Sequence, residues 1–122
     1  MTDGEGVELI VDGVGGQVFN DSLDALAHFG RLVTYGFASG KIETVDTGRL
    51  LFENKSVIGF HLGNALERDP ERMYSVVSEL SDGLNDGDLR VVVGETFDLE
   101  EAAAAQSLIE NRNSTGKVVL VP

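Results

Sequence analysis

The stretch that decides the fold is "VELIVDGVGG", residues 7–16, in which a mostly apolar run leads into a cluster of glycines. Residues 7–11 predict a short β-strand covered on both faces, because such strands carry nearly continuous apolar sequence. A strand, then glycines, then a helix is also how a dinucleotide-binding loop begins. The stretch therefore predicts either a phosphate-binding loop or a structural turn.

The glycine fingerprint of dinucleotide-binding loops, G-x-G-x-x-G, is only partly present. Gly13 and Gly15 fill its first two positions, but Val18 stands at the third, where a small residue lets helix and strand pack closely. An acidic residue is also expected at the tip of the next strand, where this sequence has Gly36. The stretch is therefore not the first unit of a dinucleotide-binding fold. Two interpretations remain: a later strand–helix unit of such a fold, or a structural turn.

The rest of the chain alternates between helix and strand patterns. Apolar residues at helical spacing from Val18 to Phe29 predict a helix after the first strand. Further strands are predicted at residues 30–36, 56–63, 89–97 and 116–122, and further helices at residues 46–54, 68–84 and 99–110. This order predicts an α/β fold whose early part is a parallel sheet with right-handed crossovers. No repeat or linker interrupts it, so we expect one domain over residues 1–122.

Two of the helices carry recognisable start signals. Asp46 and Thr47 are alternative N-caps for the helix at residues 46–54, since both side chains can accept a hydrogen bond from the first turn. Asp98 and Glu101 have the spacing of a capping box, with Asp in place of Ser or Thr.

Composition narrows the function classes. The 122 residues include no cysteine, which excludes disulfides, zinc fingers, iron–sulfur clusters and thiol catalysis. Nine Lys and Arg against 21 Asp and Glu give a net charge of −12, which disfavours nucleic-acid binding. The acids indicate either a solvated surface or adaptation to high salt. No apolar run reaches about 18 residues and no secretory signal is visible, so we expect a cytoplasmic protein without a membrane span.

Three other motifs were tested against known chemistry. "GFASG", residues 36–40, places alanine where the nucleophile elbow needs serine, so a flexible loop at a strand end is the better interpretation. "SDGLNDGD", residues 81–88, fails the calcium-loop register. His28 and His61 have no ligand partner at helical spacing, so no metal site is expected. His61, near a predicted strand end, is the more interesting of the two.

"NRNSTGK", residues 111–117, is the densest cluster of basic and hydroxyl side chains in this acidic sequence. Its backbone amides, together with Arg112 and Lys117, could contact a phosphate. The alternative is an ordinary helix C-terminus, where cations are favourable in any case.

The segments "GVELIVDGVGG", "FNDSLDALAHFGRLVTYGFASG", "SVIGFHLG" and "VVVGETFDLEEAAAAQSLIENRNSTGKVVLVP" together resemble the medium-chain dehydrogenase/reductases. The branch they resemble is the zinc-free, NADPH-dependent quinone oxidoreductases. The resemblance covers the whole chain but corresponds only to the C-terminal portion of such an enzyme. It implies that residues 1–88 form the second half of a Rossmann-like parallel sheet with flanking helices. Residues 89–122 would then form strands that return to a GroES-like domain absent from this sequence.

The resemblance also implies a reaction and a set of cofactor contacts. The reaction is hydride transfer from NADPH, or NADH, to a quinone or an activated alkene, and it implies no metal and no particular catalytic residue here. The implied cofactor-binding residues are Val14, Gly15, Gly16, Tyr35, Gly36, Phe37, Ser39, His61, Leu62, Gly63, Asn113 and Lys117. Because the resemblance leaves the first half of the Rossmann sheet, with its complete glycine fingerprint, outside this sequence, we expect the isolated chain to bind the cofactor weakly or not at all and to be inactive.

Partners follow from the same resemblance. The strand from Ser56 to Leu62 is apolar and lacks proline, and in relatives it pairs with its twin, so a homodimer is expected. Two alternatives to a catalytic portion stay open. One is a non-catalytic dimerising α/β module, and the other is one half of a split oxidoreductase whose remainder lies on a separate chain.

Overall fold

The structure is a computed structural model that describes residues 2–122. In chain order its elements are β1 (Val7–Asp12), α1 (Gln17–Ala25), β2 (Leu26–Thr34), α2 (Thr47–Glu53), β3 (Ser56–Gly59), α3 (Leu62–Arg68), α4 (Pro70–Asp86), β4 (Val93–Asp98), α5 (Ala102–Glu110) and β5 (Lys117–Val121). The chain divides into two compact units, Met1–Met73 and Tyr74–Pro122, with the boundary inside α4.

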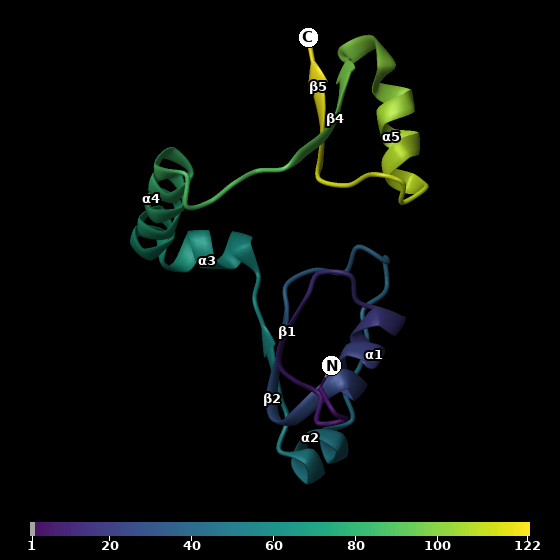
Figure 1. Ribbon diagram of the computed structural model, residues 1–122. Coiled ribbons are helices and arrows are strands. Elements are labelled where there is room, and N and C mark those ends of the chain that lie inside the picture. The colour runs from purple at the N-terminus through teal and green to yellow at the C-terminus, as the bar shows by residue number, and fades with distance from the viewer. Residues whose placement is uncertain (1) are drawn as a thin grey trace. The chain divides into compact units, whose positions relative to one another are not determined.

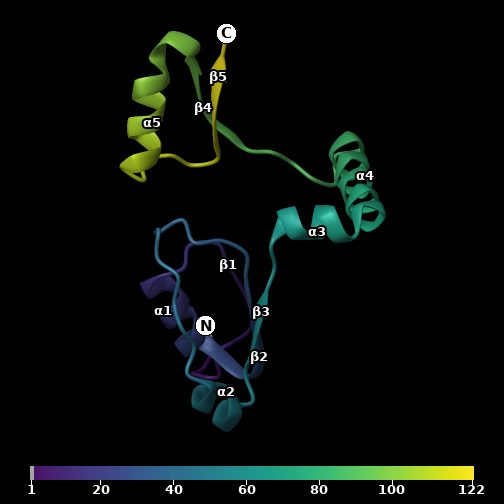
Figure 2. The same cartoon turned by 180° about the vertical axis from the view of Figure 1, so that it is seen from behind.

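The first unit is built on a three-stranded sheet. Its strands lie in the order β1-β2-β3, and both neighbouring pairs are parallel (Figures 1 and 2). Helix α1 connects β1 to β2, and α2 connects β2 to β3. The predicted parallel sheet is therefore confirmed for this part of the chain.

The core of the first unit lies between α1 and one face of the sheet. Phe19 and Leu23 from α1 are buried against Leu26 and Leu32 from β2. Ile10, Val45, Leu50 and Val57 pack around this cluster. Each fully buried side chain of this size stabilises the fold by about 1.5–3 kcal/mol relative to an exposed one. This small cluster therefore fixes the position of α1 over the sheet.

The opposite face of β1 is open. Leu9 is 54% exposed and Val11 is 62% exposed, whereas Ile10, between them, packs against the core. The prediction that this strand is covered on both faces is therefore wrong for residues 2–122. The reason is that side chains alternate along a strand, and the packing cluster of the first unit occupies only one of the two faces.

The helix predicted to run through Phe29 ends at Ala25 instead. Leu26 and Phe29 belong to β2, and the buried positions of α1 are not the predicted Val18 stripe but Phe19 and Leu23. The apolar spacing continued past the true helix end because Leu26 packs into the same core from the sheet.

An irregularity follows in β2. Val7 pairs with Leu26 and Leu9 pairs with Arg31, so β2 carries extra residues opposite β1. Within this stretch Phe29 has a φ of +62°, a left-handed conformation that is uncommon for an aromatic residue.

The start of α2 agrees with the sequence prediction, whereas the end of β3 does not. Asp46, one of the two candidate caps, accepts a hydrogen bond from the Gly48 amide at 2.8 Å. Strand β3 ends at Gly59, earlier than predicted, because the chain turns into α3, a helix that the sequence did not predict.

A buried lysine links the connecting helices of the first unit. Lys55 Nζ donates to the carbonyl oxygen of Leu23, in the last turn of α1, at 2.9 Å. The same ammonium lies 2.5 Å from the Glu53 carboxylate, and this hydrogen bond lowers the pKa of Glu53 below its ordinary value. Lys55 thus satisfies a carbonyl group at a helix end and anchors the start of β3 to α1.

The second unit contains a parallel pair of strands, β4 and β5, with α5 running alongside them (Figure 1). The capping box of Asp98 and Glu101 is confirmed, since the Glu101 carboxylate accepts from the Asp98 amide at 3.3 Å. It starts a short 3-10 turn that continues into α5, as the helix prediction for residues 99–110 required. Strand β4 begins at Val93, four residues later than predicted.

The left-handed backbone at Phe29 generates a stability prediction. Phe29 is 75% exposed, so Phe29→Gly loses little packing and relieves the steric conflict of a Cβ at positive φ. We expect it to leave the free energy of unfolding unchanged or raise it by up to about 1 kcal/mol, measured by urea denaturation.

The matched control is Phe52→Gly. Phe52 is 82% exposed but lies in α2 with ordinary helical geometry. This control should lower stability by about 0.5 kcal/mol, the difference in helix propensity. A Phe29→Gly variant that loses as much stability as Phe52→Gly would show that the left-handed backbone carries no strain.

Candidate functional site

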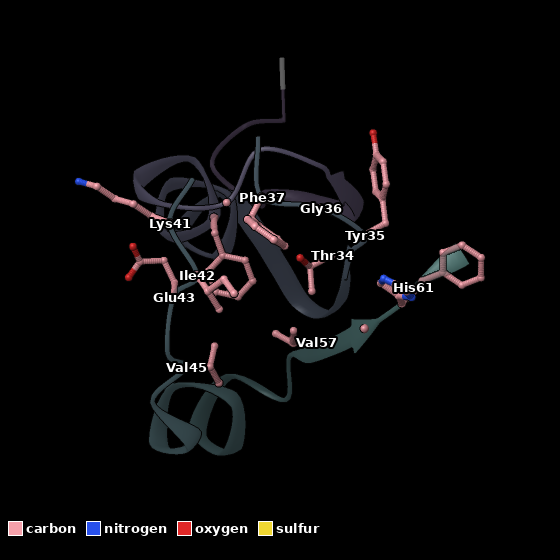
Figure 3. A pocket seen from close by; sticks show the side chains of 14 residues that line it. Thr34, Tyr35, Gly36, Phe37, Lys41, Ile42, Glu43, Val45, Val57 and His61 are labelled. Carbon is pink, nitrogen blue, oxygen red and sulfur yellow. The ribbon is translucent and has the colours of Figure 1, made fainter. Parts of the chain in front are cut away.

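A cleft of about 330 Å³ opens in the first unit (Figure 3). It lies where the parallel strands β1, β2 and β3 end, the position at which open α/β sheets bind ligands. Its lining residues are Gly15, Phe19, Thr34, Tyr35, Gly36, Phe37, Lys41, Ile42, Glu43, Val45, Val57, Gly59, Phe60 and His61. Most of the side chains around the hollow are apolar, and Lys41 extends away from it.

The turn after β1 forms one wall of the cleft. Asp12, only 3% exposed, accepts hydrogen bonds from the Val14 amide at 2.8 Å and from the Gly15 amide at 3.2 Å. Gly15 has a φ of +69°, and a Cβ there would lie 2.7 Å from the carbonyl oxygen of Lys41. The glycine-rich part of residues 7–16 is therefore a turn whose amides are bound by the Asp12 side chain. Gly15 lies where the backbone of a second loop approaches.

The loop after β2 forms the second wall and is hydrogen-bonded to the first. The amides of Tyr35, Ala38 and Ser39 donate to the carbonyl groups of residues 12, 13 and 14 at 2.9–3.0 Å. A Cβ at Gly36 would lie 3.0 Å from the Gly13 carbonyl oxygen. A glycine in the second loop thus allows the two loops to run in close contact.

The third wall follows β3. The Phe60 amide donates to the carbonyl oxygen of Thr34 at 2.9 Å, which extends the pairing just past the strand. His61 then acts as the N-cap of α3, and its Nδ1 accepts a hydrogen bond from the Asn64 amide at 3.1 Å. His61 was predicted to lie on the strand, whereas it lies at the start of a helix and lines the cleft.

The structure brings together five of the twelve predicted cofactor contacts. Gly15, Tyr35, Gly36, Phe37 and His61 all line the cleft. Val14, Gly16 and Ser39 lie in the first two loops without lining the cleft. Leu62 and Gly63 begin α3, directly after the third wall, and do not line it either.

Sequence reasoning missed the cleft residues that follow the second loop. Ile42, Val45 and Val57 line the apolar side, and Thr34 lies at the end of β2. Asp12 was also missed, although an aspartate directly before a glycine-rich turn is a signal for a side chain that closes its own turn.

Asn113 and Lys117 belong to the second unit. The amides of Asn111, Arg112 and Asn113 donate to carbonyl groups of α5. These three amides therefore end the helix and are not available to a phosphate. Lys117 lines a separate hollow with Arg90, Val91, Val92 and Gly116.

Within residues 2–122, no group of three His, Cys, Asp or Glu side chains is placed to hold a metal ion. Over the same part of the chain, no helix combines the length and the apolar character needed to cross a membrane.

A parallel sheet with connecting helices, and a mainly apolar cleft at the carboxyl ends of its strands, defines the class of α/β ligand-binding domains. The chain belongs to the zinc-binding dehydrogenase family, which it matches over residues 1–120.

Its relatives include quinone oxidoreductases. It is 34% identical over 98% of its length to a quinone oxidoreductase-like protein 2 homolog of Nematostella vectensis, and 32% identical over its whole length to a quinone oxidoreductase of Pseudomonas aeruginosa. Among solved structures, it is similar to a mycobacterial protein in complex with NADPH, with a TM-score of 0.81 and 34% identity over 99% of this chain. It is also similar to a Pseudomonas syringae quinone oxidoreductase, with a TM-score of 0.78 and 33% identity.

The chain spans about a third of the length of these relatives: 33% and 38% of the two curated proteins and 37% of each of the two solved chains. It matches their C-terminal portion, and the Rossmann-like fold class predicted from the sequence is confirmed.

The close contact at Gly15 generates a test of the cleft wall. Gly15→Ala would place a Cβ 2.7 Å from the Lys41 carbonyl oxygen at positive φ. Gly40→Ala is the matched control, since Gly40 has a φ of +75° but no atom within 4 Å of a Cβ. By denaturant unfolding we expect Gly40→Ala to cost about 1 kcal/mol from backbone strain alone. Gly15→Ala should cost about 1–3 kcal/mol more from overpacking. Equal losses in the two variants would contradict the close approach of the two loops.

Proposed function

We propose that this chain forms the nicotinamide-binding side of an NADPH-dependent oxidoreductase that transfers hydride to a quinone or an activated alkene. The observation that carries the proposal is the cleft at the ends of β1, β2 and β3. Family membership and the NADPH complex of a 34% identical mycobacterial protein support the choice of cofactor. The names of the quinone oxidoreductase relatives support the substrate class.

The cleft suits one part of such a cofactor. Its volume of about 330 Å³ lies at the lower end of the range of roughly 300–1,000 Å³ that is usual for ligand pockets. A Cβ at Gly59, at the end of β3, would meet no atom within 4 Å, so space is open there. The residues that would hold the nicotinamide part are Gly15, Tyr35, Gly36 and Phe37, together with His61. When bound, the cofactor supplies the hydride, and the protein supplies position and surroundings.

The role of the apolar lining is to exclude water from the bound ring. Phe37 and Ile42 are both more than half exposed, so a flat ring placed against them would bury apolar surface on both partners. Removing water also strengthens every polar contact made inside the cleft. We assign no catalytic residue to the hydride step itself, because the chain contributes position rather than a covalent group.

Zinc chemistry does not fit these residues, although the family description names zinc. The sequence contains no cysteine, and the described residues contain no cluster of three potential ligands. We therefore derive no step through a metal ion held by this chain.

The phosphates of the cofactor are not held at the glycine turn. A dinucleotide-binding loop uses free backbone amides at the start of a helix to bind pyrophosphate. In this chain the amides of Val14 and Gly15 are already bound by the Asp12 carboxylate. That carboxylate also places a negative charge where a phosphate would have to approach. The affinity of the isolated chain for NADPH should therefore be weak.

Titration calorimetry tests the cofactor proposal. We expect the isolated chain to give no micromolar binding with NADPH, since the Asp12 carboxylate occupies the amides of Val14 and Gly15 and repels a phosphate at the glycine turn. The full-length Pseudomonas aeruginosa relative serves as the control. A micromolar dissociation constant for the isolated chain would contradict the assignment of Asp12 as the group that occupies these amides.

We also propose a homodimer that forms through β3 and the residues that follow it, from Ser56 to Leu62. In the described part of the chain, β3 pairs with β2 alone, and Ile58 on it is exposed. An unpaired apolar edge is a template for pairing with a second strand, and a two-fold dimer covers both copies at once. This edge equally supports the second candidate function, a non-catalytic dimerising module. It also permits a split oxidoreductase whose remaining part lies on a separate chain.

Sedimentation velocity tests the dimer. Ile58→Lys places a charge on the exposed face of β3 and should shift the chain from dimer to monomer. Leu51→Lys, at an exposed position on α2, is the control and should leave the dimer intact. A wild-type chain that sediments as a monomer at all concentrations would contradict the proposal.

A further inference from the structure

Among the residues proposed to hold the nicotinamide part, His61 carries a polar ring whose contact with the ligand the proposed function does not specify. It lies where the chain passes from β3 into α3 and lines the cleft that holds Thr34 and Phe37 (Figure 3). We infer that the neutral imidazole of His61 donates a hydrogen bond from Nε2 to a carbonyl oxygen on a flat ring bound in the cleft. This inference rests on the proposed function, because it takes the nicotinamide or the quinone as the ring.

The cap of α3 determines which ring nitrogen carries the proton. Nδ1 of His61 accepts a hydrogen bond from the Asn64 amide at 3.1 Å. An accepting ring nitrogen has no proton, so the proton of the neutral imidazole lies on Nε2. The helix cap therefore prepares His61 as a donor at its other nitrogen.

Packing on the first turn of α3 determines where that donor faces. A Cβ at Gly63 would lie 3.0 Å from Cε1 and 3.4 Å from Nδ1 of His61. The edge of the ring formed by Cε1 and Nδ1 therefore lies against the first turn of α3, and Nε2 is more than 4 Å from that Cβ position. Among the hydrogen bonds of the described residues, the His61 ring uses only Nδ1, so the Nε2 proton is available to a ligand.

The surroundings of His61 select the class of acceptor. The cleft has apolar side chains, with Phe37, Ile42 and Val57 among them, and a flat ring packs well against such a surface. One donor at the margin of an apolar cleft fixes the orientation of a ring that carries an acceptor. The carboxamide of nicotinamide and the carbonyl of a quinone both present such an oxygen. The shared chemistry is thus a planar ring with a conjugated carbonyl.

Two variants separate the cap from the donor. In His61→Asn, the amide oxygen takes the place of Nδ1, so the cap of α3 is kept while the donor at the Nε2 position is lost. In His61→Gln, the longer side chain places an amide N–H near the Nε2 position, while the cap is weakened because Gln is not a favoured N-cap residue. If His61 only capped α3, His61→Asn would keep both the melting temperature and probe binding, and His61→Gln would lower both.

Nuclear magnetic resonance titrations of the full chain carry the test, with reduced nicotinamide mononucleotide and 1,4-benzoquinone as separate probes. We expect His61→Asn to weaken binding of at least one probe about fivefold, as for the loss of one neutral hydrogen bond, with an unchanged melting temperature. His61→Gln should bind within about twofold of the wild type and melt at a lower temperature. The probe that responds identifies the source of the carbonyl group.

Every other result of these titrations contradicts the inference, the proposed function or both. Wild-type binding that is unchanged in His61→Asn, or equally lost in both variants, overturns the inference and leaves the proposed function standing. No binding of either probe by the wild-type chain overturns both. A long-range ¹H–¹⁵N spectrum of the wild type should show the proton on Nε2 at neutral pH, and a proton on Nδ1 would overturn the inference without any ligand.

Discussion

The buried carboxylate of Asp12 is the interaction on which the rest of the site depends. It ends β1 and binds the amides of Val14 and Gly15, so it fixes a glycine-rich turn that would otherwise adopt many conformations. The loop after β2 is hydrogen-bonded to this turn, and the end of β3 is hydrogen-bonded to the end of β2. The Asp12 side chain therefore fixes the first wall of the cleft. Backbone hydrogen bonds then join the second wall to the first and the third wall to the end of β2.

The same interaction distinguishes this turn from the phosphate loop that it resembles in sequence. Both structures need glycines where a strand passes into a helix, because the backbone turns sharply there. They differ in what the amides bind: a ligand phosphate in one and the protein's own carboxylate in the other. This chain has the second arrangement, and its net charge of −12 adds to the unfavourable environment for a phosphate.

Two features of the first unit concern surfaces rather than the cleft. The open face of β1 carries Leu9 and Val11, and the edge of the sheet carries Ile58. Apolar side chains on a sheet usually pack against another layer, and edges usually pair or are protected. In the first unit, neither of these apolar surfaces is covered. The cleft, by contrast, is lined entirely by residues of the first unit.

The sequence by itself determined the alternation of strands and helices, the parallel sheet, the capping box at Asp98 and the family. The alternation, the parallel sheet and the capping box follow from local patterns, since periodicity and caps are properties of neighbouring residues. The family follows instead from the resemblance of whole segments to known proteins. Only the tertiary structure decided that Leu26 leaves the helix for the sheet, that the Asp12 carboxylate turns inward and that His61 caps a helix while lining the cleft. Each of these depends on groups brought together by folding. The sequence pattern around a buried leucine is the same whether the leucine packs from a helix or from a strand. The hydrogen-bond partners of a polar side chain can lie far from it in the sequence.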